Sequence, residues 1–128
     1  MPGMDQTGET TVTRGRRAET IAAVFLELGG YRVLARNARC GPLEVDLIAV
    51  RGGTIAFVEV RARSSRAHGT PEESVRWRKQ ECLTRAARGI LEGLALPPDV
   101  RVRFDLIAIE LEPFGLRLRH RLGCWPPR

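Results

Sequence analysis

The sequence predicts one α/β domain with a mixed central sheet, in the element order α-β-β-β-α-β-β, and with helices flanking the sheet. Three observations predict this class. Apolar residues recur at three-to-four spacing in two segments, which is typical of amphipathic helices. Five other segments combine apolar alternation with β-branched residues, which is typical of strands. With 128 residues and 43% hydrophobic content, the chain can bury one globular core.

The first helix is expected from about Arg14 and should end at Gly29-Gly30, because glycines terminate helices. Its opposite face carries Glu19, which is therefore expected at the rim of the surface on which the helix packs. The predicted buried stripe consists of Ala18, Ile21, Ala22, Phe25 and Leu28.

Three strand-like segments follow, at residues 31–39, 43–51 and 54–63. Cys40-Gly41-Pro42 and Gly52-Gly53 separate them and favour tight turns, so the three strands should form an antiparallel meander.

A second helix is expected to start near Thr70-Pro71, where a cap residue precedes a proline and a glutamate follows at the third position. Leu96-Pro97-Pro98 should close it. Strands are then expected at 101–111 and 116–122. Because a strand–helix–strand crossover joins parallel neighbours, the third and fourth strands should be parallel. The predicted apolar stripe of the helix is Leu83, Ala86, Ala87, Ile90, Leu91 and Leu94.

Residues 13–123 are expected to form this single domain, after a flexible N-terminal segment over 1–12 and before a short tail over 124–128. No apolar run approaches the roughly 20 residues of a membrane span, and the N-terminus lacks the order of a signal peptide. The cysteines fit neither a disulfide framework nor a zinc site, so we expect a soluble cytoplasmic protein. They are odd in number and far apart, at Cys40, Cys82 and Cys124.

The second hairpin carries two acids inside apolar segments. If Gly52-Gly53 forms a two-residue loop, Arg51 pairs with Thr54 and Asp46 lies opposite Glu59. Two like charges placed this way, roughly 5 Å apart, destabilise a sheet unless something neutralises them. Carboxylate oxygens suit Mg²⁺ or Mn²⁺, so the register predicts a metal site.

The same register places Glu44 opposite Arg61, next to where a phosphate would lie. The simpler alternative is a solvated hairpin in which Glu44 and Arg61 form an ordinary surface pair. A three-residue loop would also shift the pairing and put Asp46 out of line.

The formal charge of +6 favours a polyanionic partner, and nucleic acid is the first one to consider. The alternative is that a GC-rich genome has loaded the chain with arginine, since Lys79 is the only lysine in the sequence.

The segment Glu44-Val-Asp46-Leu-Ile-Ala, followed by Phe57-Val-Glu59-Val-Arg61-Ala-Arg63, resembles the YraN-type family of small bacterial proteins, which are regarded as candidate endonucleases. The resemblance covers roughly residues 14–123. Further matching segments are Gly15-Arg-Arg-Ala-Glu19, residues 30–37, residues 71–75 with Lys79-Gln80, and Arg103-Phe104-Asp105.

The resemblance implies a restriction-endonuclease-like fold, similar to archaeal Holliday-junction resolvases. It makes Asp46 and Glu59 the metal ligands and Glu19 the supporting helix acid. Glu44, which the register places one pair away from the two ligands, is expected to assist. In such enzymes the metal lowers the pKa of a water that attacks the phosphodiester. Arg61 stands at the position of the usual lysine; it cannot accept a proton from water, but it can hold a phosphate.

Lys79 is either a displaced catalytic amine or present by chance, and Trp77 either stacks on a base or anchors the helix start. Asp105 serves either the site or a structural salt bridge, and no role is assigned to His68 or His120. The expected nucleic-acid contacts are Arg61, Arg63, Arg76, Arg78 and Lys79.

The leading expectation is therefore a metal-dependent endonuclease or resolvase-like enzyme acting on DNA. The main alternative is a nucleic-acid-binding module of the same fold that does not cleave. A third possibility is a partner-binding protein whose charge only provides solubility. A homodimer is compatible with the sequence and not indicated by it.

Overall fold

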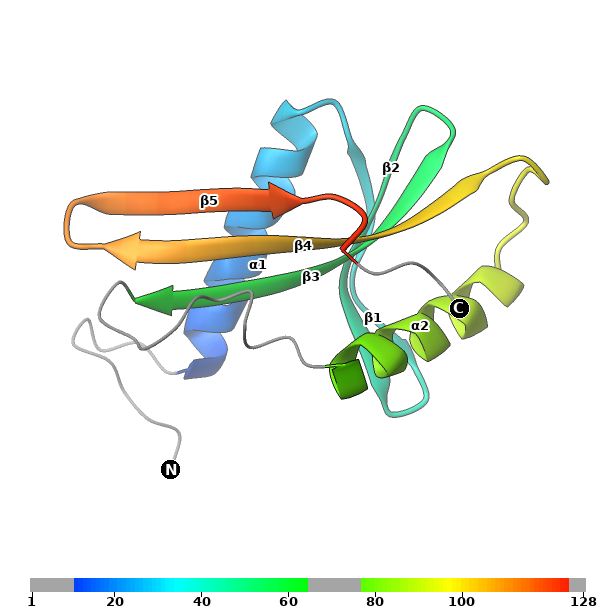
Figure 1. Ribbon diagram of the computed structural model, residues 1–128, viewed down its shortest axis with the longest axis horizontal. Coiled ribbons are helices and arrows are strands. Elements are labelled where there is room, and N and C mark those ends of the chain that lie inside the picture. Colours follow the sequence, from blue (N-terminus) through cyan, green and yellow to red (C-terminus); the bar gives the residue numbers. More distant parts are fainter. Residues whose placement is uncertain (1–10, 65–76, 125–128) are drawn as a thin grey trace.

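The computed structural model describes residues 11–64 and 77–124, with the side chains of 15–64 and 80–124. Five strands form one sheet in the order β1-β2-β3-β4-β5 (Figure 1). The pair β3–β4 is parallel and the other neighbouring pairs are antiparallel. The elements are α1 (Thr11–Leu28), β1 (Arg32–Cys40), β2 (Leu43–Arg51), β3 (Thr54–Ser64), α2 (Trp77–Glu92), β4 (Arg101–Glu112) and β5 (Gly115–Arg121).

The predicted α/β class, the element order and the parallel β3–β4 crossover are confirmed. Two helix boundaries differ from the prediction. The first helix begins at Thr11, inside the segment expected to fray, and the second ends at Glu92, before Leu96. The predicted helix start at Thr70-Pro71 lies outside the described residues.

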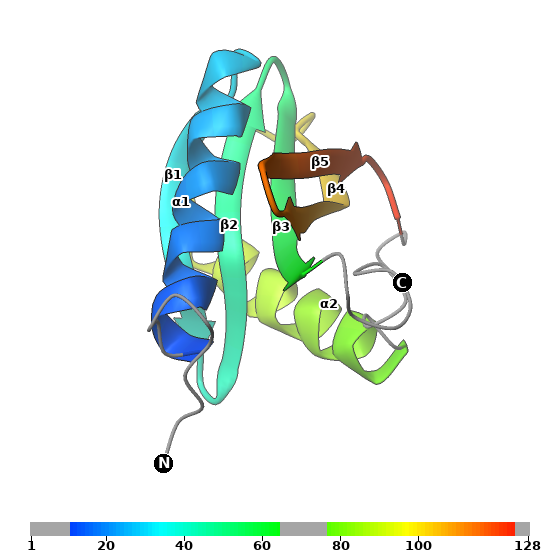
Figure 2. The same cartoon turned by 90° about the vertical axis from the view of Figure 1, so that its left-hand side faces the viewer.

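The two helices cover opposite faces of the sheet. In β3, Ala56 and Val58 belong to the hydrophobic cluster that contains α1, whereas Ile55 and Phe57 belong to the cluster that contains α2. Successive side chains of a strand alternate between its faces, so β3 is buried on both sides. Figure 2 shows α1 running alongside β1 and β2.

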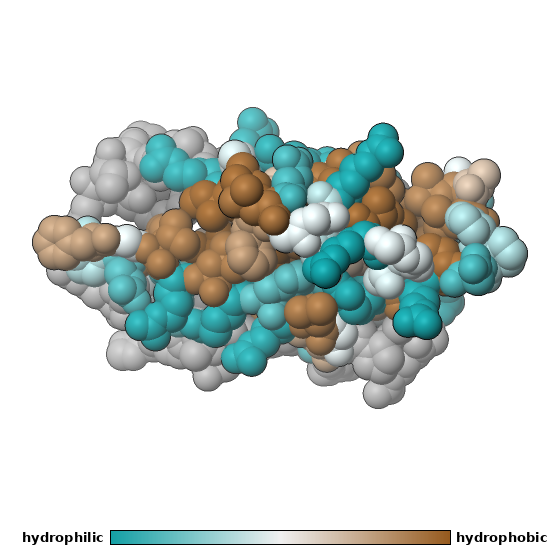
Figure 3. Space-filling view, turned by 90° about the horizontal axis from the view of Figure 1, so that it is seen from above, coloured by the Kyte–Doolittle hydropathy of each residue, from teal (hydrophilic) through white to brown (hydrophobic). Residues whose placement is uncertain are grey.

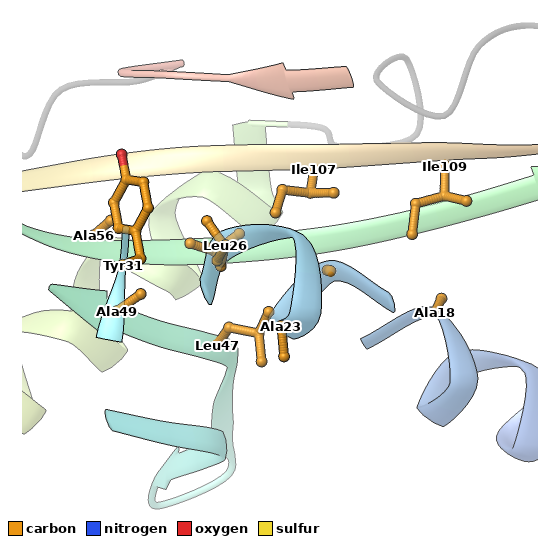
Figure 4. Packing of buried hydrophobic residues seen from close by; sticks show 11 residues of the cluster. Ala18, Ala23, Leu26, Tyr31, Leu47, Ala49, Ala56, Ile107 and Ile109 are labelled. Atoms are coloured by element: carbon orange, nitrogen blue, oxygen red, sulfur yellow. The ribbon is translucent and has the colours of Figure 1, made fainter. Parts of the chain in front are cut away.

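The buried face of α1 differs from the predicted stripe. Phe25 and Leu28 are exposed, at 39% and 84%, whereas Leu26 is fully buried. Ala18, Ala22 and Leu26 recur every four residues and belong to the cluster that α1 forms with the sheet, and the small alanines let the helix lie close to it. Figure 4 shows Ala18 and Leu26 among the residues of this cluster. The prediction that Phe25 and Leu28 are buried is therefore wrong. The helix turns the face that carries Ala18, Ala22 and Leu26 to the sheet, which leaves Phe25 and Leu28 at the surface.

Exposed hydrophobic side chains are scattered over the surface rather than collected on one element. On the face seen in Figure 3, hydrophobic residues form several groups divided by hydrophilic ones. The most exposed is Phe114, which lies between β4 and β5. Within the described part of the chain, neither helix has the length and apolar character needed to cross a membrane.

Candidate active site at the fork between two strands

Strands β2 and β3 separate halfway along their length. They pair from Arg51↔Thr54 to Leu47↔Val58, so the two-residue Gly52-Gly53 turn and its register are as predicted. Beyond Leu47 and Val58, β2 continues beside β1 to its first residue, and β3 continues beside β4 to its last (Figure 1). We call the place where the two strands part the fork.

Asp46 is the first residue of β2 beyond the paired region, and its side chain bridges the fork. The backbone N–H of Val60 donates a hydrogen bond of 2.8 Å to Oδ2 of Asp46. The pairing of Asp46 with Glu59 that the register predicted is therefore wrong, since the ladder ends one position earlier. Instead, the Asp46 carboxylate accepts the hydrogen bond that the Val60 amide would otherwise donate to a neighbouring strand.

Glu19 reaches the same region from α1. Burial and the negative charge of Asp46 raise the pKa of Glu19, and the charge of Glu44 acts in the same direction. A hydrogen bond from Asn37 and the charge of Arg36 oppose the rise. In the described part of the chain, the buried Oε2 atom of Glu19 has no hydrogen-bond partner. The charges of Asp46 and Glu44, both candidate catalytic residues from the sequence, thus act on Glu19, which the sequence grouped with them.

Glu59 and Arg61 form a largely buried ion pair on β3. Nη2 of Arg61 lies 3.0 Å from Oε1 of Glu59, and the side chains are 34% and 3% exposed. They alternate with Val58, Val60 and Ala62, which pack on the α1 side. Glu59 and Arg61 therefore project toward the opposite face of the sheet from Glu19.

Glu44 does not face Arg61, so that prediction is wrong. It lies opposite Arg39 on β1 and forms an ion pair with it at 3.2 Å. The cause is the fork: at Glu44, strand β2 has already left β3 and keeps only β1 as its neighbour.

The carboxylates fit a hard divalent cation that keeps most of its water. Mg²⁺ is usually held by one or two protein carboxylates together with water and substrate phosphate. Asp46 has its orientation set by the Val60 amide, and Glu19 offers a buried oxygen without a hydrogen-bond partner among the described residues. Across 11–64 and 77–124, no three histidine, cysteine or acidic side chains are arranged as a ready-made metal cage. The donors thus fit a sparse magnesium-type site and not a closed structural one.

The predicted nucleic-acid contacts are only partly described. Arg61 and Arg63 are half-buried on β3. Arg76 lies outside the described residues, and for Arg78 and Lys79 only the helical backbone of α2 is described. Their contact with nucleic acid therefore stays a prediction, as does the catalytic role considered for Lys79.

Asp105 belongs to a structural network and not to the fork. It is fully buried and accepts hydrogen bonds from the guanidinium of Arg103, from His120 and from the Gly123 amide. Arg103 also donates to the hydroxyl of Tyr31. The network joins β4 to β5 and to the start of β1. Of the two roles considered for Asp105, the structural one holds, and His120 has a structural role that its sequence position did not reveal.

Asn37 is the site residue that sequence reasoning missed. It sits inside β1 with φ at 52°, and its side chain hydrogen-bonds Glu19. Asparagine is depleted in strands and enriched among non-glycine residues of positive φ. An asparagine in the middle of an expected strand was therefore the available signal.

Known proteins of the same kind share most of this chain. Residues 18–109 match the family described as uncharacterised protein family UPF0102. A UPF0102 protein of Chlorobaculum parvum is 50% identical over 95 residues, which is 74% of this chain and 73% of the relative. One of Symbiobacterium thermophilum is 46% identical over 108 residues, covering 84% and 90%. One of Moorella thermoacetica is 45% identical over 105 residues, covering 80% and 87%. The matched segment contains Glu19, Asp46 and Glu59, and the chain belongs to the UPF0102 family, in agreement with the YraN-type resemblance of its motifs.

Proposed function

We propose that this chain is a metal-dependent endonuclease that hydrolyses phosphodiester bonds in DNA in the cytoplasm, with Mg²⁺ or Mn²⁺ held by Asp46 and Glu59. One observation carries the proposal: the Asp46 carboxylate of β2 bridges the fork to the Val60 amide, next to Glu59 in β3, and its charge acts on Glu19 of α1. Acids placed within central strands are costly unless they are paired or bind a cation. The restriction-endonuclease-like fold implied by the family resemblance uses such acids for that purpose.

Each residue of the fork has a distinct part in the proposed reaction. The bound metal supplies Lewis acidity and a water of lowered pKa. The Val60 amide fixes the Asp46 carboxylate, so its orientation is set in advance. Burial and the charge of Asp46 raise the pKa of Glu19, which favours this carboxylate as a proton acceptor. The charge of Glu44 also favours the protonated form of Glu19.

Arg61 binds the phosphate in this scheme. Its side chain is partly exposed while it neutralises Glu59, and its buried Nε has no hydrogen-bond partner among the described residues. A guanidinium presents several donors in a fixed plane that matches phosphate oxygens. Because it stays protonated, it stabilises the developing charge and leaves proton transfer to a carboxylate.

The second candidate function is a nucleic-acid-binding module of the same fold that does not cleave. The Arg61–Glu59 ion pair favours it, because an acid neutralised by an arginine has less negative charge to offer a metal. In this alternative the chain binds DNA in a salt-sensitive way through its arginines, with or without divalent metal.

The test is cleavage of branched, single-stranded and linear duplex DNA with Mg²⁺ or Mn²⁺. We expect Asp46→Ala and Glu59→Ala to lower the cleavage rate by about 100-fold or more. Glu112→Gln is the matched control, because Glu112 is an acid paired with Arg117 at the far end of β4. Salt-sensitive binding without any cleavage by the intact chain would favour the binding module, and cleavage that survives both substitutions would refute the assigned site.

A further inference from the structure

Asn37 adopts a backbone conformation that other residues of the strands avoid. It is the one non-glycine residue with positive φ, at 52°, within the described segments. L-residues disfavour this left-handed region, and asparagine tolerates it better than most. Conformations of this kind persist where the surrounding structure enforces them, and they cluster at functional sites.

At this position, the regular alternation of side chains between the two faces of the sheet is interrupted in both β1 and β2. Ala35 and Ala38 of β1 both belong to the α2 cluster, and so do their partners Ile48 and Val45 of β2. Ala35 and Ala38 are three positions apart in β1, and Val45 and Ile48 are three positions apart in β2. Strict alternation would place residues of the same face two positions apart. The alternation is therefore broken in both strands at the same level.

Four residues at the break interact with α1 or with its hydrophobic cluster. On β1, Arg36 donates a hydrogen bond to Thr20 of α1, and Asn37 bonds Glu19. On β2, Leu47 packs in the α1 cluster, and Asp46 acts on Glu19. With unbroken alternation from Leu47, Asp46 would point to the α2 side, away from Glu19.

We propose that Asn37 is a positioning residue of the candidate active site: its left-handed backbone turns the β1–β2 arm so that Asp46 meets Glu19, and its side-chain amide holds the Glu19 carboxylate in place. The inference rests on the proposed metal-dependent nuclease function and adds a residue to its site. Glu19 and Asp46 repel each other, so an amide donor on Glu19 holds this supporting acid in place beside Asp46, the proposed metal ligand.

Three substitutions separate the two roles of Asn37. Asn37→Gly allows the positive φ and removes the amide. Asn37→Ala removes the amide and disfavours the backbone conformation. Asn37→Asp tolerates the conformation but places a further carboxylate against Glu19. Mn²⁺ binding by isothermal titration calorimetry without DNA, thermal unfolding, and the kcat and KM of DNA cleavage are measured for each.

We expect Asn37→Gly to keep a thermal midpoint close to that of the unsubstituted chain while Mn²⁺ affinity falls by about tenfold or more. In cleavage, kcat should fall with little change in KM, because the acids and not the DNA contacts are displaced. Asn37→Ala should lose both thermal stability and Mn²⁺ affinity. Asn37→Asp should keep the fold but resemble Asn37→Gly in metal binding and cleavage.

Failure of this inference is distinguishable from failure of the proposed function. If the unsubstituted chain binds Mn²⁺ and cleaves DNA, and Asn37→Gly does both equally well, Asn37 does not position the site. If the unsubstituted chain neither binds Mn²⁺ nor cleaves, the nuclease proposal falls and the inference falls with it. Glu112→Gln serves as the control that should behave like the unsubstituted chain in every assay.

Discussion

Two acids of this chain show how their hydrogen-bond partners decide what a buried carboxylate can do. Burial alone would raise the pKa of Asp105, but the hydrogen bonds from His120 and Arg103 hold the pKa below its usual value. At Glu19, burial and the charge of Asp46 prevail, and the pKa is raised. The surroundings of Asp105 therefore stabilise its charged form, which contributes to folding. The surroundings of Glu19 disfavour its charged form, as is common for functional groups.

The Asp105 network should make the free energy of unfolding depend on pH in the acidic range. Because the folded pKa lies below the ordinary value of 3.8, its contribution is present above about pH 4 and is lost as pH falls through the folded pKa. We expect Asp105→Asn to lower the free energy of unfolding at neutral pH by about 3 to 5 kcal/mol, since it leaves Arg103 without its charged partner. Urea unfolding at a series of pH values measures both effects. An acid limb of equal steepness in the two proteins would contradict the account.

Glu19 should behave in the opposite way. Its folded pKa is raised above the ordinary 4.5, so its ionisation opposes folding at higher pH. We expect Glu19→Gln to raise the urea midpoint at pH 7 in the absence of divalent metal. The gain should vanish as pH falls below about 4.5, where the acid is protonated in both states. A lower midpoint at pH 7 would show that the charged carboxylate stabilises the fold.

At the scale of elements, α2 packs closely against β1 at Gly89, where the absence of a side chain leaves room for Cys40 of β1. A Cβ added at Gly89 would overlap with Sγ of Cys40, and its next contact is the Cβ of Cys40 at 3.6 Å. Ile90 and Cys40 pack in the same hydrophobic cluster. A side chain at position 89 would therefore force either Cys40 or the helix to shift.

We expect Gly89→Ala to lower the free energy of unfolding by about 1 kcal/mol, because the overlap outweighs the better helix propensity of alanine. In a Cys40→Ala background the same substitution should be neutral or stabilising by up to about 1 kcal/mol, since the sulfur is gone. A double-mutant cycle in urea measures the difference. Equal effects in the two backgrounds would show that Sγ of Cys40 does not limit the approach of the helix.

Local patterns in the sequence were sufficient for most elements and for one register. Gly52-Gly53 sets the loop length, so pairing through Leu47↔Val58 followed from it. The end of that pairing could not be predicted, because beyond Val58 strand β3 follows β4 while β2 stays with β1. The same non-local cause moved Glu44 from Arg61 to Arg39.

At the scale of the whole molecule, the fork results from two demands on one sheet. Strand β3 pairs with β4 along its full length through the α2 crossover, while β2 stays with β1 down to their connecting turn. The helix α1 packs on the side where the strands part and supplies Glu19 there. The residue types of the site were thus readable from the sequence, whereas their grouping required the three-dimensional arrangement.

The central claim is that the acids of the fork bind a divalent cation, and the most direct test is thermal unfolding as a function of Mn²⁺ concentration. A ligand that binds only the native state raises the midpoint by mass action. We predict a saturable rise for the unsubstituted chain, and its loss in Asp46→Asn but not in Glu112→Gln. A midpoint that does not change with Mn²⁺, or one that rises equally in Asp46→Asn, would contradict the account.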